Sequence, residues 1–370
     1  MIKKINKPIQ ISFIGGGINS SIGNMHFISS QLDSNFRVSS GFFSRNKIKN
    51  IQSMKKYKID SNRLYFNIDD LIKNEKNIVD FFLILTPTPD HFKTLIKLIK
   101  ANVNIIVEKP ILSNINEVNK INKLINNYKK KIYTIYNYTG YPALREIKHI
   151  IEKNNYGKLL SLNIFMTQES FLRNQNKDQK IKKWRKTDKE IPNLFLDLGI
   201  HVHNLSNFLT DLTPSSVLTN SIKYKNVIAD AKIFINYNNG TKGIFWISKA
   251  SLGNRNSIDV ELFFENCSIK WSQDNFEYII ISEKNGTQKK IDRSVKSLEF
   301  HQSRYNRYRM GHPAGFIEAF ANMYHDIAQD FLGVKNKYIF NYKTALKDLK
   351  FLHYATSSYK KNKWIKINKL

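Results

Sequence analysis

The first third of the chain alternates short apolar runs with segments whose apolar residues recur every three to four positions. This rhythm predicts strands that are each followed by a helix. The expected strands are Ile11–Ile14, Phe36–Phe43, Ile78–Thr86, Asn104–Val107 and Ile132–Tyr136, and the expected helices are Gly23–Leu32, Ile48–Tyr57, Asp69–Lys73, His91–Ala101 and Ile115–Tyr128. The alternation, with short connections, predicts an α/β region built on a parallel, doubly wound sheet.

After residue 138 the pattern changes to longer strands with alternating apolar and polar positions. The expected strands are Leu159–Gln168, Ser216–Tyr224, Ala231–Tyr237, Thr241–Ser248, Ser257–Glu265, Ser268–Gln273 and Phe276–Glu283, and the expected helices are Pro142–Lys153, Leu194–Leu209, Gly315–Phe331 and Lys343–Tyr359. Asn239-Gly240 and Asn285-Gly286 are typical hairpin turns. We therefore expect two domains, residues 1–138 and 139–370, the second an α+β domain with a large open antiparallel sheet.

Composition narrows the class of protein. The 370 residues are 41% hydrophobic and 12% aromatic, which predicts a globular chain. No apolar run approaches the ~20 residues of a membrane helix, and the polar N-terminus lacks the features of a secretory signal, so we expect a cytoplasmic protein. Cys267 is the single cysteine, so no intrachain disulfide and no metal site are expected.

The chain carries 59 basic and 30 acidic residues, a net charge of +29. Such a charge raises the alternative of nucleic-acid binding. However, only eleven of the basic residues are arginines, and the lysines are spread over nearly every segment beside abundant Asn and Ile. This distribution favours a solvated basic surface. The charge can still attract anionic substrates or nucleotides, but we expect no nucleic-acid or membrane partner.

Gly15-Gly16-Gly17 lies between the first expected strand and helix, the context of a dinucleotide-binding loop. Without a Cβ the backbone can approach a pyrophosphate at the N-terminus of the helix. The usual spacing fails, because position 20 is serine and the next glycine is Gly23. A lengthened loop, with the Ser20 and Ser21 hydroxyls as added phosphate donors, is one interpretation; a glycine turn of another α/β fold is the alternative.

The end of the second strand bears on the choice of cofactor. An NAD-dependent enzyme usually has an acidic residue there for the ribose hydroxyls, whereas this chain has Ser44 and Arg45. A guanidinium is suited to a 2′-phosphate, so the pattern favours NADP over NAD. Alternatively, Arg45 is a solvated turn residue that lies on the adenine.

Several motifs follow in a characteristic order. They are Thr86–His91, Glu108-Lys109-Pro110, Asn137–Pro142, Trp184–Asp188, Asp197–His201 and His312–Phe320. Together with the glycine loop, over roughly residues 10 to 360, they resemble the Gfo/Idh/MocA family of glucose–fructose oxidoreductase and inositol dehydrogenase, in a branch that acts on sugars and anhydrosugars. The resemblance implies an N-terminal Rossmann domain and a second domain whose open antiparallel sheet often forms the interface of a homo-oligomer, a dimer or tetramer.

The resemblance also implies that Lys109, Asp197 and His201 form the catalytic group. Oxidation of a secondary alcohol removes a hydride from carbon and a proton from the hydroxyl, and histidine is the suitable general base. Asp197 and His201 are four residues apart, on one face of the expected helix. Lys109 is expected to stabilise the developing alkoxide, and Asp197 is expected to orient Lys109. We thus expect an NAD(P)-dependent oxidoreductase acting between nicotinamide and a hydroxyl or ketone of a sugar, anhydrosugar, polyol or derivative.

The resemblance places further residues at the site. The dinucleotide is expected to contact Gly15, Gly17, Ser20, Ser21, Ser44, Arg45, Thr86, Pro87, His91, Glu108 and Lys109. Tyr138, Arg145, Trp184 and Arg185 are candidates for the carbohydrate, although core packing explains them equally well. The chain departs from many relatives at Leu194-Phe195, where small residues are common. This departure keeps open a dinucleotide-binding scaffold or redox sensor without catalytic activity.

Overall fold

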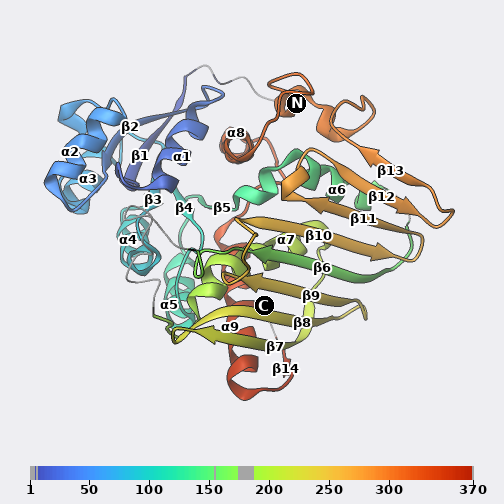
Figure 1. Cartoon of the computed structure of the whole chain (residues 1–370). Coiled ribbons are helices and arrows are strands. Elements are labelled where there is room, and N and C mark those ends of the chain that lie inside the picture. The colour runs from blue at the N-terminus through green and yellow to red at the C-terminus, as the bar shows by residue number, and fades with distance from the viewer. Residues whose placement is uncertain (1–4, 6, 154–155, 174–186, 369–370) are drawn as a thin grey trace. The chain divides into compact units, whose positions relative to one another are not determined.

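The computed structural model describes residues 5, 7–153, 156–173 and 187–368 (Figure 1). The chain divides into two compact units, the first comprising residues 1–140 and 314–346, and the second residues 141–313 and 347–370. The expected boundary near residue 138 is close to the observed one. The segment 314–346, in contrast, clusters with the first unit, although we expected it in the second domain.

The first unit is built on five parallel strands in the order β2-β1-β3-β4-β5. The strands are β1 (Ile9–Gly15), β2 (Phe36–Phe42), β3 (Phe81–Leu85), β4 (Ile105–Glu108) and β5 (Ile132–Ile135). The helices are α1 (Ser21–Gln31), α2 (Lys47–Lys56), α3 (Ile68–Glu75), α4 (Thr88–Lys100), α5 (Ile115–Ile125) and α8 (Phe316–Phe331), with short 3-10 turns η1 (Ser61–Arg63) and η2 (Asn137–Gly140). The expected doubly wound parallel sheet is confirmed. Strand order reverses between β1 and β3, where such sheets bind ligands at the carboxyl ends of their strands.

Helix α8 joins the first unit through contacts with residues far away in sequence. Asn322 Nδ2 donates a hydrogen bond to the Gly140 carbonyl over 2.8 Å, and the Phe320 ring packs edge-on against His26 of α1. Phe320 ends the motif His312–Phe320, and Asn322 follows that motif by two residues. Contacts between residues so distant along the chain leave no local periodicity. The sequence therefore predicted the helix but did not assign it to the first unit.

The second unit contains a nine-stranded sheet in the order β13-β12-β11-β10-β6-β9-β8-β7-β14 (Figure 1). The strands are β6 (Leu159–Thr167), β7 (Pro214–Tyr224), β8 (Val227–Tyr237), β9 (Lys242–Ser248), β10 (Ser257–Phe264), β11 (Cys267–Ser272), β12 (Ile279–Glu283), β13 (Gln288–Ile291) and β14 (Ile365–Lys366). The remaining elements are α6 (Pro142–Lys153), a π-helical turn η5 (Phe195–Gly199), α7 (Ile200–Thr210), α9 (Tyr342–Lys361), and the 3-10 turns η6 (Gln273–Asn275), η7 (Glu299–His301) and η8 (Ser303–Tyr305). Helix α9 begins within the first unit and continues into the second.

The expected large sheet is confirmed with two corrections. The pair β6–β9 is parallel, while the other pairs in the sheet are antiparallel. The short strands β13 and β14 were not expected, because β13 is polar and β14 has two residues. Strand pairing, unlike strand formation, depends on which segments meet in space, and this is not encoded in alternation.

Alternation along β9 separates two faces of the sheet. Gly243, Phe245 and Ile247 are buried, and their side of the sheet meets the helices, since the Phe245 and Phe351 rings lie 5.9 Å apart. Phe351 belongs to α9. The core of the second unit therefore lies between this face and helices α7 and α9. None of the helices in the described ranges is long and apolar enough to cross a bilayer.

Candidate dinucleotide and catalytic site

The glycine loop ends β1 at the point where strand order reverses. Gly15 has φ +86°, and a Cβ there would come within 2.8 Å of the Leu85 carbonyl and the Thr86 nitrogen. Only glycine therefore fits between the carboxyl ends of β1 and β3. Beside it the Thr86 hydroxyl is buried without a hydrogen-bond partner among the described residues. A cradle lacking side chains next to a buried hydroxyl fits a dinucleotide, whose polar groups can pair with that hydroxyl.

The irregular spacing of the loop has a structural explanation. Ser20 is the N-cap of α1, and its Oγ accepts a hydrogen bond from the Gly23 nitrogen over 3.1 Å. A Cβ on Gly23 would lie 2.1 Å from the Gly16 carbonyl oxygen. Gly23 thus provides the close approach of helix and strand that the third glycine of the usual motif provides. Ser21 is exposed in the first helical turn, where backbone N–H groups and a serine hydroxyl can meet a phosphate.

Ser53 of helix α2 and Tyr57, the C-cap residue of that helix, hold the loop from behind, and sequence reasoning missed both. The Tyr57 hydroxyl donates to the Gly16 carbonyl over 2.7 Å, and burial raises the pKa of Tyr57 to about 12. The Ser53 hydroxyl accepts from the Ile18 nitrogen over 2.8 Å. The only sequence signal was their spacing of four residues, which places both on one face of a helix.

His91, which is expected at the cofactor, joins two loops at the carboxyl edge of the sheet. It is buried, with Nε2 2.8 Å from the Thr86 carbonyl and Nδ1 2.9 Å from the Pro110 carbonyl. Burial lowers the pKa of His91, while the contacts with the two carbonyls act in the opposite direction. Pro87 follows Thr86 as an exposed residue of the same edge. His91 therefore positions the loops that carry Thr86 and Lys109.

Glu108, also expected at the cofactor, is engaged in a buried chain of side chains. The Tyr324 hydroxyl lies 2.7 Å from His26 Nδ1, and His26 Nε2 lies 2.8 Å from Glu108 Oε1. Burial raises the pKa of Tyr324, so the phenol keeps its proton and donates a hydrogen bond to Nδ1. This chain links α1, β4 and α8 of the first unit. Lys109 follows Glu108 at the carboxyl end of β4, at the same edge as Gly15 and Thr86, and is half-buried.

The end of β2 presents Ser44 and Arg45 as expected. Asn50 Oδ1 accepts hydrogen bonds from the backbone nitrogens of Phe43 and Ser44, at 2.8 and 3.1 Å, which fixes this turn. Arg45 is exposed, and its Nη2 lies 2.7 Å from Asp90 Oδ2 in the first turn of α4. Because the guanidinium already has an acidic partner, a phosphate has to compete with Asp90 for it.

In the second unit, Asp197 lies in the π-helical turn η5 and His201 in the first turn of α7. Asp197 is half-buried and His201 is buried. The two are one turn apart along a continuous helical segment, as expected, although the π-turn was not predicted. Leu194 and Phe195 are buried, so the bulky residues before Asp197 pack in the interior.

Asp197 Oδ2 lies 2.6 Å from the Nζ of Lys249, the residue that follows β9. Sequence reasoning missed Lys249. A signal was present, because 249 continues the inward row 243, 245 and 247 of β9, and a lysine at an inward position is unusual. His203, two residues beyond His201, instead pairs its Nδ1 with Asp348 Oδ1 at 2.6 Å and stacks on Phe351, a structural role.

The carbohydrate candidates have different surroundings. Tyr138 is buried in the first unit and contacts the Phe316 ring edge-on. Arg145 in α6 is fully buried, and its Nη1 donates to the Tyr305 hydroxyl over 3.1 Å. Trp184 and Arg185 lie outside the described residues. Tyr138 thus packs within the first unit, and Arg145 contributes a buried positive charge to the second unit; both stay candidates for the carbohydrate.

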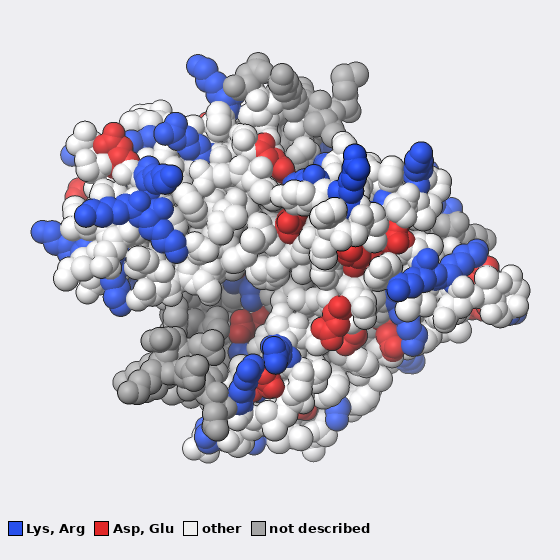
Figure 2. Space-filling view, turned by 45° about the horizontal axis from the view of Figure 1, so that its top comes forward, with Lys and Arg blue, Asp and Glu red and all other residues white. Residues whose placement is uncertain are grey.

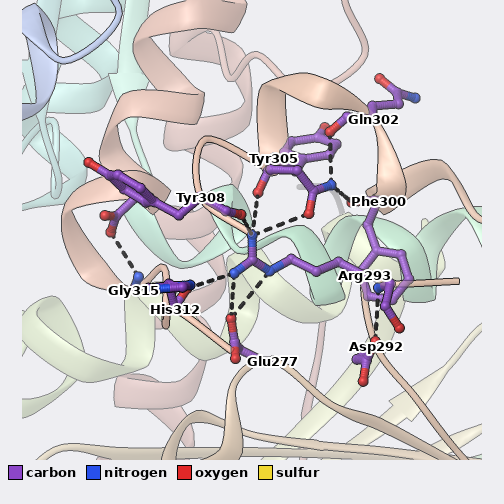
Figure 3. A network of polar contacts seen from close by, with 12 residues as sticks. Glu277, Asp292, Arg293, Phe300, Gln302, Tyr305, Tyr308, His312 and Gly315 are labelled. Carbon is purple, nitrogen blue, oxygen red and sulfur yellow. Dashed lines mark hydrogen bonds and ion pairs between the residues drawn. The ribbon is translucent and has the colours of Figure 1, made fainter. Parts of the chain in front are cut away.

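The position of Tyr305 depends on a second buried arginine (Figure 3). The Arg293 guanidinium lies 2.9 Å from Glu277 Oε1 and donates to backbone carbonyls of the following loop, those of Tyr305, Tyr308 and His312. The Arg293 side chain thereby holds three points of the segment 292–313 together. Because Tyr305 contacts Arg145, Arg293 also fixes the surroundings of Arg145.

The surface charge shows no concentrated basic stripe on the face drawn in Figure 2. Lys and Arg side chains are scattered there, with Asp and Glu among them. Exposed ion pairs such as Lys97–Asp69 and Lys289–Glu283 neutralise part of the charge locally. This distribution agrees with a solvated basic surface.

A glycine cradle on a doubly wound parallel sheet, followed by a second unit built on an open sheet, defines a dinucleotide-dependent oxidoreductase. The family described as "Oxidoreductase family, NAD-binding Rossmann fold" matches residues 9–136, and the "GFO/IDH/MocA C-terminal domain" matches residues 144–270. Together the matches span well over half of the chain. The protein belongs to the Gfo/Idh/MocA family of NAD-binding oxidoreductases.

Individual relatives agree with this assignment. A Bacillus subtilis (strain 168) protein described as uncharacterized oxidoreductase YfiI is 23% identical over 345 residues, which cover 86% of this chain and 84% of the relative. An inositol dehydrogenase homolog from Azotobacter vinelandii, solved with NAD+, has a TM-score of 0.88 at 18% identity, covering 99% of each chain. Levoglucosan dehydrogenase, solved with NADH and L-sorbose, has a TM-score of 0.84 at 15% identity over 98% of this chain and 100% of that chain. At these identities the structural likeness establishes the fold.

Proposed function

We propose that this oxidoreductase interconverts a secondary hydroxyl and a ketone on a sugar, anhydrosugar, polyol or derivative, using NAD(P). The observation that carries the proposal is the glycine cradle beside the buried Thr86 hydroxyl, with Lys109 at the same edge of the sheet. Similar folds solved with NADH and myo-inositol, and with NADH and L-sorbose, support the carbohydrate class.

The roles of the residues follow from their chemistry. Gly15, Gly17 and the first turn of α1 would hold the pyrophosphate, with the Ser20 and Ser21 hydroxyls and Thr86 as further partners. The bound dinucleotide accepts the hydride in oxidation and supplies it in reduction. His201 takes the hydroxyl proton in oxidation and returns it in reduction. The Lys109 ammonium stabilises negative charge on the substrate oxygen, and the Asp197 carboxylate orients this group.

The test combines cofactor binding with turnover. Fluorescence titration with NADH and NADPH is expected to show saturable binding, followed by turnover of at least one member of a carbohydrate and polyol panel with the preferred cofactor. Binding without any turnover would instead support a scaffold or redox sensor. Nanomolar oligonucleotide binding that weakens steeply with salt would support the nucleic-acid alternative.

For cofactor preference we propose NADP, through contact of Ser44 and Arg45 with the 2′-phosphate. Arg45→Ala is then expected to weaken NADPH binding about tenfold, the loss of one charged hydrogen bond, and to leave NADH binding nearly unchanged. Asp90→Asn is the matched control, since it releases the guanidinium from its partner; NADPH affinity should be equal or higher. Titration of all three proteins with both cofactors measures this, and a wild-type preference for NADH overturns the assignment.

We further propose a homo-oligomer formed through the outer face of the large sheet. On the face opposite to Phe245, Phe165 of β6 pairs with Trp246 of β9, and Phe234 of β8 pairs with Ile244 of β9. The Phe165 and Trp246 rings contact one another with centroids 6.0 Å apart. Sedimentation equilibrium is expected to give at least a dimer, and Trp246→Glu should shift it towards monomer. A monomeric wild type at micromolar concentration contradicts the proposal.

A further inference from the structure

Lys249 is a buried lysine on the face of the sheet that packs against helices. Its side chain is 5% exposed. Its backbone is held on both sides, because its nitrogen donates to the Ala229 carbonyl over 2.8 Å and its carbonyl accepts from the Phe171 nitrogen over 2.9 Å. These bonds extend the sheet beyond β9 and leave Lys249 little freedom to move.

The ammonium of Lys249 is directed at the proposed catalytic carboxylate. Its Nζ lies 2.6 Å from Asp197 Oδ2, and the Phe171 ring lies 5.5 Å from the same nitrogen. Binding of one carboxylate oxygen fixes the rotation of the carboxylate and therefore the direction of its other oxygen. The π-turn that carries Asp197 and the sheet extension that carries Lys249 thus define one orientation of Asp197.

Stability alone does not explain this pair. Desolvation of two charges offsets most of their attraction, and replacement of buried ion pairs by apolar residues is often neutral or stabilising. The neighbouring inward positions on β9 hold Phe245 and Ile247, so an apolar residue would suit position 249 as well. A buried lysine that faces a catalytic residue is therefore better explained by what it does to Asp197.

We propose that Lys249 is a positioning residue that holds the Asp197 carboxylate in the orientation needed for the hydroxyl–ketone reaction. This inference rests on the proposed function, because it acts through Asp197. Asp197 lies one helical turn before His201, the residue proposed to transfer the proton, and Lys249 Nζ contacts the Asp197 carboxylate without taking part in proton transfer. The second unit accordingly contributes a Lys–Asp–His set rather than an Asp–His pair.

The experiment is a double-mutant cycle on kcat, KM and dinucleotide affinity. Lys249→Met is expected to lower kcat about 10–100-fold, the usual cost of a misplaced catalytic group, with dinucleotide affinity unchanged. If Lys249 acts through Asp197, the Lys249→Met/Asp197→Asn variant should be no slower than Asp197→Asn within about threefold. Lys249→Arg keeps the charge and should recover part of kcat.

Lys148 provides the matched control. It is also a buried lysine of the second unit, 8% exposed, with Nζ 2.8 Å from Asp211 Oδ2. Lys148→Met is expected to keep kcat near the wild-type value. Equal losses in Lys148→Met and Lys249→Met would reduce Lys249 to a structural residue.

Urea unfolding supplies a readout that does not depend on turnover. It is measured on the four proteins of the cycle, which are the wild type, Lys249→Met, Asp197→Asn and the double variant. Asp197→Asn should change the unfolding equilibrium constant less when residue 249 is Met than when it is Lys, as expected for two residues in contact. Additive effects in unfolding, additive losses in kcat, or near-normal kcat in Lys249→Met each overturn the assignment of Lys249. Absence of wild-type turnover on the whole panel overturns the proposed function instead.

Discussion

Alanine at Lys109 or at His201 is expected to lower turnover by about 10²–10⁴-fold while dinucleotide affinity stays nearly unchanged. His201→Ala removes the group that moves the hydroxyl proton. Lys109→Ala removes the positive charge that stabilises the substrate oxygen, a contribution that is larger in the transition state than in the ground state. The measurement is kcat with an identified substrate, together with fluorescence titration of the preferred cofactor.

Matched controls separate chemistry from folding. His203→Ala changes a histidine of the same helix, and its loss of the Asp348 contact should lower stability more than turnover of the folded enzyme. Lys97→Ala removes an exposed lysine of the first unit that is paired with Asp69, and it should change neither stability nor turnover. Near-normal activity in both Lys109→Ala and His201→Ala would remove these residues from the catalytic group.

The second large effect is expected from Gly23→Ala. The new Cβ would lie 2.1 Å from the Gly16 carbonyl oxygen, so α1 and the glycine loop must separate. Overpacking of this kind costs about 1–3 kcal/mol, which corresponds to a loss of dinucleotide affinity of about 10–100-fold if it is expressed at the loop. Fluorescence titration measures the loss of dinucleotide affinity, and thermal unfolding measures the loss of stability.

A control for Gly23→Ala lies in the same helix. Ile28 is exposed on α1, and Ile28→Ala is expected to leave cofactor affinity unchanged. Wild-type affinity and stability in Gly23→Ala would show that Gly23 does not serve as the glycine of close approach, and the irregular loop would need another explanation.

Local patterns located most of the elements. The apolar run around Ile78–Thr86 is strand β3, and the segment from Pro142 to Lys153 is α6 within the same bounds. Tight turns were equally clear, since Gly240 and Gly286 have the positive φ that their hairpins require. Elements of this kind depend on residues close in sequence, so a single sequence predicts them.

Several site residues could not be placed in this way. The position of Gly15, Gly16 and Gly17 between a strand and a helix indicated the loop, but the partners that hold it, Ser53 and Tyr57, come from α2 and its C-cap. Glu108 and His91 were expected at the cofactor, and the structure buries both in contacts with other parts of the first unit. Chemical type predicts that a residue matters, whereas its partner is determined only by the fold.

The sequence by itself determined the two kinds of sheet, the glycine loop between the first strand and helix, and the family motifs, because periodicity, the position of glycines and residue order are local properties of the chain. Tertiary structure alone decided that residues 314–346 belong to the first unit, that β6 and β9 run parallel, and that Lys249 meets Asp197. Each of these joins residues at least fifty positions apart. Such contacts form because packing and hydrogen bonding bring complementary surfaces together, and no short-range pattern records them.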